Sequence, residues 1–295
     1  MKILVTGAAG FIGSHVVDAY LAAGHDVVAV DNLATGQREN VNPAARFYEA
    51  DVRDLELMTR IFEDEKPDVV NHHAAQVNIR VSVERPLYDT EVNVVGTVSV
   101  LEAAARCQAR KVIFISSGGA VYGEPRDLPA TEETPPKPIS HYGAAKLAGE
   151  AYCHVYHVTR GLIYTILRYA NVYGPRQNPG GEAGVTAIFA RMMLRGEQPR
   201  IFGDGTKTRD YVYVGDVAAA NVAALDRGDG QVFNIGTGRQ VSDREVFDAV
   251  ARAAGYRGEP EYTDFRPGGV MHPGGDCAGA REVSGGGPGA VREGG

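Results

Sequence analysis

Short apolar runs alternate with longer amphipathic segments over residues 1–170. The apolar runs carry mostly β-branched or aromatic residues, and they lie at 2–6, 27–30, 46–50, 68–71, 111–115 and 163–168. The amphipathic segments repeat apolar residues at helical spacing, and they lie at 11–23, 55–64, 83–106 and 142–156. Buried strands that alternate with helices are typical of βαβ units, in which each helix crosses over a parallel sheet. The pattern therefore predicts an α/β fold with a doubly wound parallel sheet.

The regular alternation stops near residue 170, where a smaller lobe is expected to begin. A helix is predicted at 187–194 and a hairpin at 200–205. A helix that starts at 214–217 and a strand at 231–235 are expected to return to the sheet. We expect a nucleotide-binding Rossmann domain at 1–170 with 210–240, a C-terminal substrate-binding lobe at 171–209 and 241–267, and a glycine-rich tail at 268–295.

The composition is that of a globular protein. Of the 295 residues, 44% are hydrophobic and 23% are charged, which is ordinary for such proteins. A formal charge of −7 without a basic run gives no reason to expect a nucleic-acid partner. No apolar stretch approaches the ~20 residues of a membrane span, and glycines interrupt the apolar start, so we expect neither a membrane segment nor a signal peptide.

Metal and disulfide chemistry are not expected. Cys107, Cys153 and Cys277 are too few and too scattered for a disulfide framework, which favours a reducing cytoplasm. None of them lies in a pair with metal-ligand spacing. His72 and His73 are adjacent, so they point to opposite faces of a strand, and no third ligand accompanies them.

A glycine-rich turn follows the first predicted strand. Gly7, Gly10 and Gly13 form the pattern G-x-x-G-x-x-G, and a helix is predicted to start at Phe11 and Ile12. Glycines allow backbone N–H groups and a helix N-terminus to approach a pyrophosphate with no Cβ in the way. We assign this turn to a dinucleotide cofactor, with a purely structural turn as the alternative.

Carboxylates end the second and third predicted strands. Asp31 and Asn32 close the second strand, where a carboxylate accepts both hydroxyls of an adenosine ribose and repels a 2′-phosphate. This position favours NAD over NADP, and the alternative is a helix-capping Asp. Asp51 and Val52 close the third strand, and Asp51 is a candidate for contact with the adenine ring.

Two further segments are expected near the cofactor. Ala74, Ala75 and Gln76 follow the strand at 68–71, where small residues let the backbone pass close to a ligand. Asn93 interrupts the apolar face of the helix at 83–106. A polar residue in such a place contacts the cofactor or makes an internal hydrogen bond, and both readings are open.

The pattern Y-x-x-x-K carries the predicted chemistry. Tyr142 and Lys146 are four residues apart at the start of a helix, so their side chains share one face. A tyrosine with a pKa near about 10 needs nearby positive charge to act as a base at neutral pH, and Lys146 supplies it. Ser117 lies just after the fifth predicted strand at 111–115 and is the candidate hydroxyl partner, with Ser116 as the fallback.

The chain resembles the extended short-chain dehydrogenase/reductase family, and within it the UDP-glucose 4-epimerase group of NAD-dependent epimerases and dehydratases. The blocks that carry the resemblance are TGAAGFIGSH (6–15), VDNL (30–33), HHAAQ (72–76), SSGGAVYG (116–123), YGAAK (142–146), RYANVYGPRQNP (168–179) and RDYVYVGDVA (209–218). The resemblance implies NAD as cofactor and a UDP-sugar as substrate, epimerised at C4 through a 4-keto intermediate. It also implies that Asn171, Arg209 and Arg266 contact the nucleotide diphosphate or its surroundings, and that the chain forms a homodimer.

The same scaffold leaves rival activities open. A 4,6-dehydratase or a decarboxylase is the nearest enzymatic rival, and dehydratase relatives place acidic residues just after the catalytic hydroxyl. This chain has Gly118, Gly119 and Ala120 there, which favours simple epimerisation. A non-catalytic NAD-binding homologue is the rival of another class.

The tail beyond residue 267 differs in character from the rest of the chain. It has 11 glycines among 28 residues and no sustained apolar periodicity. Such a composition favours a flexible tail or the product of an altered reading frame. Sequencing of the coding region decides between the two.

Overall fold

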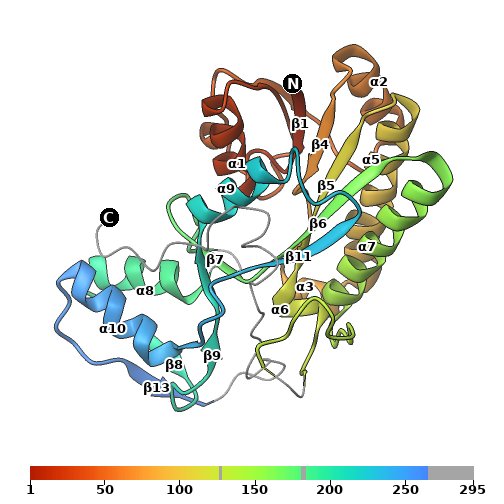
Figure 1. The fold of residues 1–295 in the computed structure, drawn as a ribbon. Coiled ribbons are helices and arrows are strands. Elements are labelled where there is room, and N and C mark those ends of the chain that lie inside the picture. Colours follow the sequence, from red (N-terminus) through yellow and green to blue (C-terminus); the bar gives the residue numbers. More distant parts are fainter. Residues whose placement is uncertain (126–127, 181–183, 265–295) are drawn as a thin grey trace.

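A seven-stranded parallel sheet forms the body of the molecule (Figure 1). The computed structural model describes residues 1–125, 128–180 and 184–264. Every strand pairs in parallel with its neighbours. From one edge to the other the strands are β11 (Gln231–Ile235), β6 (Ile163–Tyr169), β5 (Lys111–Ser117), β4 (Val69–His72), β1 (Lys2–Thr6), β2 (Asp26–Asp31) and β3 (Arg46–Glu49). The predicted doubly wound α/β fold is confirmed, including the return of residues 231–235 to the sheet.

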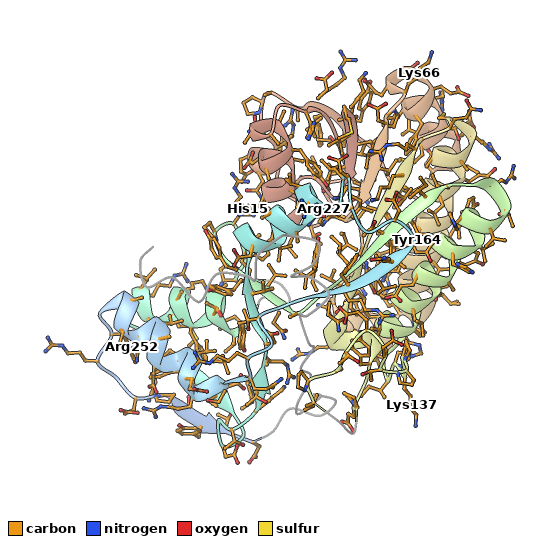
Figure 2. The ribbon with its side chains drawn as sticks, in the orientation of Figure 1. His15, Lys66, Lys137, Tyr164, Arg227 and Arg252 are labelled. Atoms are coloured by element: carbon orange, nitrogen blue, oxygen red, sulfur yellow. The ribbon has the colours of Figure 1, made fainter. Side chains whose placement is uncertain are left out.

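Helices cover both faces of the sheet (Figure 1). On one face α1 (Phe11–Ala22) packs with α9 (Val214–Ala223), and their apolar side chains join one core cluster. On the other face α2 (Leu55–Glu65), α5 (Gly96–Arg106) and α7 (His141–Arg160) contribute to a second cluster. Figure 2 shows His15 on the α1 side of the sheet and Tyr164 on strand β6.

The chain reverses its direction of winding at β1, which lies between β4 and β2. Because β1 and β4 are parallel, their carboxyl ends lie at the same edge of the sheet. The helices that follow these two strands pack on opposite faces of the sheet. In open α/β sheets this reversal opens the crevice in which ligands bind. The turns that follow β1, β2 and β4 all meet at this edge.

The expected helix at 83–106 is confirmed over residues 86–106, but it is interrupted at Arg85 and contains a π-helical turn. The structure has α3 (Ile79–Glu84), α4 (Pro86–Thr90), a π-helical turn η2 (Glu91–Val95) and then α5. Pro86 occupies the first turn of α4, and Arg85 before it has an extended φ of −135°, because proline disfavours helical backbone at the preceding residue. The π-helical turn contains Asn93, and such turns often occur at functional sites.

The smaller lobe is built from short strand pairs and two helices. Its strands are β7 (Asn171–Tyr173) paired with β10 (Tyr211–Tyr213), β9 (Thr208–Arg209) with β12 (Val241–Ser242), and β8 (Arg200–Phe202) with β13 (Glu261–Thr263). The helices α8 (Val185–Leu194) and α10 (Asp243–Ala254) pack together, and Figure 2 shows Arg252 on α10. The expected hairpin at 200–205 is wrong, because β8 pairs with the distant strand β13. Two short elements complete the described chain: η1 (Arg38–Asn40) and α6 (Gly118–Val121).

A buried carboxylate fastens α2 to the sheet. Glu65 accepts hydrogen bonds from Arg46 (2.8 Å), Tyr48 (2.6 Å) and Lys2 (3.1 Å), and its side chain is 2% exposed. Burial alone raises the pKa of Glu65, but the donors Tyr48, Arg46 and Lys2 outweigh it and lower the pKa to about 2. The carboxylate therefore joins β1, β3 and the end of α2.

Replacement of Glu65 by Gln should destabilise the fold in a pH-dependent way. The folded-state pKa lies below the ordinary value of 4.5, so the stabilisation is complete above that value and is lost as the pH falls toward about 2. We expect Glu65→Gln to lower the free energy of unfolding at pH 7 by roughly 2–3 kcal/mol, the scale that corresponds to the lowered pKa of Glu65. Urea unfolding across this pH range should show the difference from the unmodified chain shrinking in acid. The exposed Glu63 on the same helix is the control, and a Glu65→Gln effect that is independent of pH would contradict the assignment.

Candidate active site

Close backbone contacts explain two of the three glycines after β1. Gly7 has a φ of +67°, and a Cβ on it would lie 2.7 Å from the backbone N of Ala74. A Cβ on Gly13 would overlap the carbonyl oxygen of Gly7. Gly10 is the N-cap of α1 and offers no side-chain cap to its first turn. The turn is therefore pressed against the segment after β4, with the N-terminus of α1 open toward the edge of the sheet, and both features fit a pyrophosphate.

Asp31 lies at the end of β2 and holds the neighbouring turns. Its carboxylate accepts hydrogen bonds from the backbone N–H groups of Ala9 (2.9 Å) and Leu33 (2.8 Å). Burial raises the pKa of Asp31, and these two N–H donors oppose the rise. Asp31 is 8% exposed and lies in a strand, so it does not have the helix-capping role that was its alternative. Each oxygen keeps acceptor capacity for a ribose hydroxyl.

Asn32 and Asp51 meet at the ends of β2 and β3. The Asn32 amide donates to Asp51 at 2.9 Å, and the Arg53 guanidinium grips the same carboxylate at 2.9 and 2.7 Å. Chiefly the Arg53 hydrogen bond holds the pKa of Asp51 well below its usual range. Val52 beside them is buried. The predicted contact of Asp51 with adenine stays a prediction.

Side-chain amides fix the segment after β4. Asn93 donates to the backbone O of Gln76 at 2.9 Å and accepts from the backbone N–H of Gln76 at 2.8 Å. The Thr6 hydroxyl accepts from the backbone N–H of Ala74 at 3.2 Å. Asn93 therefore makes the internal hydrogen bonds that were one of the two alternatives for this residue. These bonds set the path of residues 74–76.

Asp89 is a site residue that the sequence analysis missed. It is fully buried, and one carboxylate oxygen accepts from the Gln76 amide at 2.7 Å and from the Asn93 amide at 3.0 Å. Asp89 precedes Asn93 by one helical turn and shares its inner face. A carboxylate at that spacing on an apolar face was the available signal.

The proposed catalytic residues converge from β5 and α7. Ser117 ends β5 and precedes α6, and its hydroxyl is hydrogen-bonded to Tyr142. Ser140 caps α7 by accepting from the backbone N–H of Gly143 at 3.0 Å. Lys146 is buried, and its ammonium donates to the backbone O of Ile115 at 2.9 Å. The ammonium lies 5.9 Å from the centre of the Tyr142 ring.

Ser116 is engaged elsewhere. Its hydroxyl donates to Glu150 at 2.5 Å, and the Glu150 carboxylate also binds Arg168 through two hydrogen bonds of 2.9 and 2.6 Å. All three side chains are buried. Of the two neighbouring serines, Ser117 is therefore the one turned toward Tyr142.

Burial dominates the protonation of the Tyr142 and Lys146 pair. It raises the pKa of Tyr142 to about 12, with the Ser117 hydrogen bond lowering and Asp89 further raising that pKa. It lowers the pKa of Lys146 to about 8, against the charges of Asp89 and Glu150. At neutral pH the chain alone therefore holds a neutral phenol beside an ammonium. The predicted lowering of the Tyr142 pKa by Lys146 stays a prediction, because burial, Ser117 and Asp89 are the causes the structure shows.

The residues expected at the substrate lie on the side of the smaller lobe. Asn171 starts β7 and helps to line a cavity of about 10 Å³ with Gly118 and Gly119. Arg209 in β9 is partly buried, and burial lowers its pKa. Its neighbour Asp210 is buried and accepts from the backbone N–H groups of Thr237 and Gly238 at 2.9 and 2.8 Å. Arg266 lies outside the described residues, as does the tail at 268–295.

The described part of the chain holds neither a cluster of metal ligands nor a helix that could span a membrane. No three His, Cys, Asp or Glu side chains in the described ranges are grouped to hold a metal ion. The His72 ring contacts the hydroxyls of Thr6 at 2.7 Å and Thr97 at 3.1 Å. None of the helices described is both long and apolar enough to span a bilayer.

Replacement of Asp31 by Ala should weaken the binding of NAD and reduce the preference for NAD over NADP. Loss of a charge-assisted hydrogen bond costs about 1.5–3 kcal/mol, so we expect the Kd for NAD to rise roughly 10-fold or more. The preference over NADP should narrow, because no carboxylate then repels the 2′-phosphate. Calorimetric titration with both dinucleotides measures this. Asp26→Ala, at the exposed start of β2, is the control, and an unchanged NAD/NADP ratio in Asp31→Ala would refute the role of Asp31.

Several known proteins are similar to this chain over nearly its whole length. The chain is 48% identical to the UDP-glucose 4-epimerase of Mycolicibacterium smegmatis over 97% of this chain and 93% of that protein. A crystal structure of UDP-glucose 4-epimerase with UDP-glucose from Thermotoga maritima matches with a TM-score of 0.95 and 49% identity, and covers 98% of this chain and 94% of that one. The UDP-glucose 4-epimerase of Thermus thermophilus in complex with NAD matches with a TM-score of 0.93 and 45% identity, over 99% and 95% of the two chains.

A family model extends over most of the chain. The model of the NAD dependent epimerase/dehydratase family matches residues 3–236, which include the glycine turn, the loop after β4 and the Ser117, Tyr142 and Lys146 group. Together with relatives of nearly half identity over almost the whole length, this match shows that the chain belongs to the NAD dependent epimerase/dehydratase family.

Proposed function

We propose that the chain is an NAD-dependent epimerase that interconverts UDP-glucose and UDP-galactose by inverting C4 of the hexose. The observation that carries this function is the Ser117, Tyr142 and Lys146 group beside the dinucleotide turn. Relatives of this length and similarity that carry UDP-glucose or NAD in their crystals support it.

The cofactor residues proposed here surround the reversal point of the sheet. Asp31 would bind the adenosine ribose, and the open N-terminus of α1 would bind the pyrophosphate. The full set is Gly7, Gly10, Phe11, Ile12, Gly13, Asp31, Asn32, Asp51, Val52, Ala74, Ala75, Gln76, Asn93, Tyr142 and Lys146. NAD, when bound, supplies the acceptor for the C4 hydride and later returns that hydride.

Tyr142 is the proposed general base and acid. As a phenolate it takes the proton of the 4-hydroxyl while hydride leaves C4, so that a 4-keto sugar forms. Ser117 donates to the same oxygen, and Lys146 would hold the nicotinamide ribose. After the keto sugar has turned its other face toward the cofactor, Tyr142 would return the proton to O4. No net oxidation results, which fits an isomerase.

The substrate would lie between the sheet edge and the smaller lobe. We propose that Ser117 and Tyr142 contact the sugar, and that Asn171, Arg209 and Arg266 contact the nucleotide diphosphate, since a guanidinium can bind phosphate oxygens at two points. This assigns residues 1–170 and 210–240 to the NAD-binding domain and 171–209 and 241–267 to the substrate lobe.

A homodimer is proposed through the helices at 79–106 and 141–160. These helices expose several large apolar side chains: Val83, Leu87, Val95, Val155 and Val158 are each between 48% and 79% exposed. Exposed apolar side chains on neighbouring helices are suited to a partner surface, and we propose that the partner is a second copy of the chain in the cytoplasm. Leu87→Asp should shift the chain toward monomer in sedimentation velocity, and an unmodified chain that sediments as a monomer would contradict the dimer.

Product analysis tests the activity directly. Incubation with either UDP-glucose or UDP-galactose should give the same equilibrium mixture of the two sugars. An epimerase catalyses the reaction in both directions and consumes no NAD. A 4-keto-6-deoxy product would support a dehydratase instead, although Gly118, Gly119 and Ala120 offer no acid after Ser117. Bound NAD without turnover would support a non-catalytic homologue.

Variants of the catalytic group are the controls of this assay. We expect Ser117→Ala to lower kcat about 100-fold, the scale of a positioned proton-transfer partner. Ser117→Thr keeps the hydroxyl and should retain most of kcat, while Tyr142→Phe should abolish turnover. Near-normal kcat in Ser117→Ala would refute the role of Ser117.

A further inference from the structure

A layer of polar side chains crosses the sheet one residue before Ser117. Ser116 on β5, Arg168 on β6 and Asn234 on β11 are paired in register across these three neighbouring strands. Each of the three is at most 5% exposed. Polar side chains at one level of a buried sheet are costly unless their donors and acceptors are satisfied. The partners that satisfy them therefore show what the layer holds together.

The Arg168 guanidinium is the centre of this layer. Its Nε and Nη2 donate to the two carboxylate oxygens of Glu150 on α7, at 2.9 and 2.6 Å, and the Ser116 hydroxyl donates to the same carboxylate at 2.5 Å. Its Nη1 donates to the Tyr122 hydroxyl at 2.7 Å. That hydroxyl donates in turn to the side-chain oxygen of Asn234 at 2.7 Å. Arg168 is thus connected with Ser116 through Glu150, and with Tyr122 directly.

Ser116 and Tyr122 flank the turn that carries Ser117. Between them lies α6, a helix of four residues that begins with Gly118 and Gly119 and receives no capping hydrogen bond from the Ser117 side chain. Glycines add conformational freedom, and so short a helix has little stability of its own. The turn therefore depends on its two ends for a fixed position, and both ends are tied to one guanidinium.

We propose that Arg168 is a positioning residue that holds the Ser117 hydroxyl toward Tyr142 by fixing both ends of the turn at 116–122. This inference rests on the proposed epimerase function, in which Ser117 donates to O4 of the sugar. A buried ion pair adds little net stability compared with well-packed apolar side chains. Its bidentate hydrogen bonds do define geometry, and a reacting group displaced by about 1 Å can lose roughly 100-fold in rate.

Tyr122→Phe tests this role, because it removes one end of the tie and keeps the buried ring and the net charge. We expect kcat for UDP-galactose to fall roughly 10-fold, the scale of one broken buried hydrogen bond, while KM and the Kd for NAD change less than about 2-fold. Tyr48→Phe is the matched control. It removes an equally short hydroxyl hydrogen bond, to Glu65 at 2.6 Å, on the strand at the far edge of the sheet, and should leave kcat unchanged.

A double-mutant cycle separates positioning from a general loss of stability. If Tyr122 acts through Ser117, Tyr122→Phe should lower kcat by less than about 2-fold in a chain that already carries Ser117→Ala. Equal losses with and without Ser117→Ala would overturn the proposal, since the effect would then bypass Ser117. A near-normal kcat in Tyr122→Phe alone would overturn it as well.

Arg168→Lys is the second variant. An ammonium can pair with Glu150, but it lacks the planar fork that reaches Glu150 and Tyr122 together. We expect a loss of kcat at least as large as in Tyr122→Phe, and again almost none when Ser117→Ala is present. Full kcat in a folded Arg168→Lys would contradict the role. If Arg168→Lys does not fold, the cycle with Tyr122→Phe still decides it.

Hydrogen exchange separates this proposal from the proposed function. In Tyr122→Phe the backbone amides of residues 117–122 should exchange roughly 10-fold faster than in the unmodified chain, whereas Tyr48→Phe should leave them unchanged. If the unmodified chain does not epimerise UDP-galactose, the function fails, and this measurement still decides whether Arg168 holds the turn. Unchanged exchange at 117–122 in Tyr122→Phe would overturn the proposal.

Discussion

The candidate site depends on one buried cation. The Lys146 ammonium lies 4% exposed beneath the ends of β4 and β5, where it donates to the backbone O of Ile115. An isolated charge in such a place is strongly unfavourable, and the neighbouring structure compensates it. Lys146 thereby fixes α7 on β5, and with it the position of Tyr142 relative to Ser117. The absence of a side chain at Gly149 allows this close packing, because a Cβ there would overlap the Phe114 ring.

The parallel sheet gathers the other parts around this cation. Every strand of the sheet ends at the same edge, so turns that are distant in sequence meet there. Gly7 touches the segment after β4, and Asn93 and Asp89 hold that segment from the helices behind it. These contacts set the path of the segment that is proposed to bind the cofactor.

The sequence predicted what is encoded by local spacing. The glycine turn, the strand ends at Asp31 and Asp51, and the shared face of Tyr142 and Lys146 all follow from residues close along the chain. Other features depend on distant partners. The strand β8 pairs with β13, which lies some sixty residues later in the chain. The prediction of a hairpin at 200–205 was wrong because this partner is distant in sequence. The choice between Ser116 and Ser117 depended on the position of Glu150, which binds Ser116. Asp89 was recognised as a site residue only from its hydrogen bonds with Gln76 and Asn93.

The high pKa of Tyr142 links the proposed chemistry to the presence of the cofactor. Burial and Asp89 keep the phenol protonated in the chain alone, so Tyr142 is a poor base there. When bound, the oxidised nicotinamide would bring a positive charge close to Tyr142, and a nearby positive charge favours the phenolate. The base would then be active only when a hydride acceptor is in place. A sugar bound without a hydride acceptor would then meet a neutral phenol, which does not take its proton.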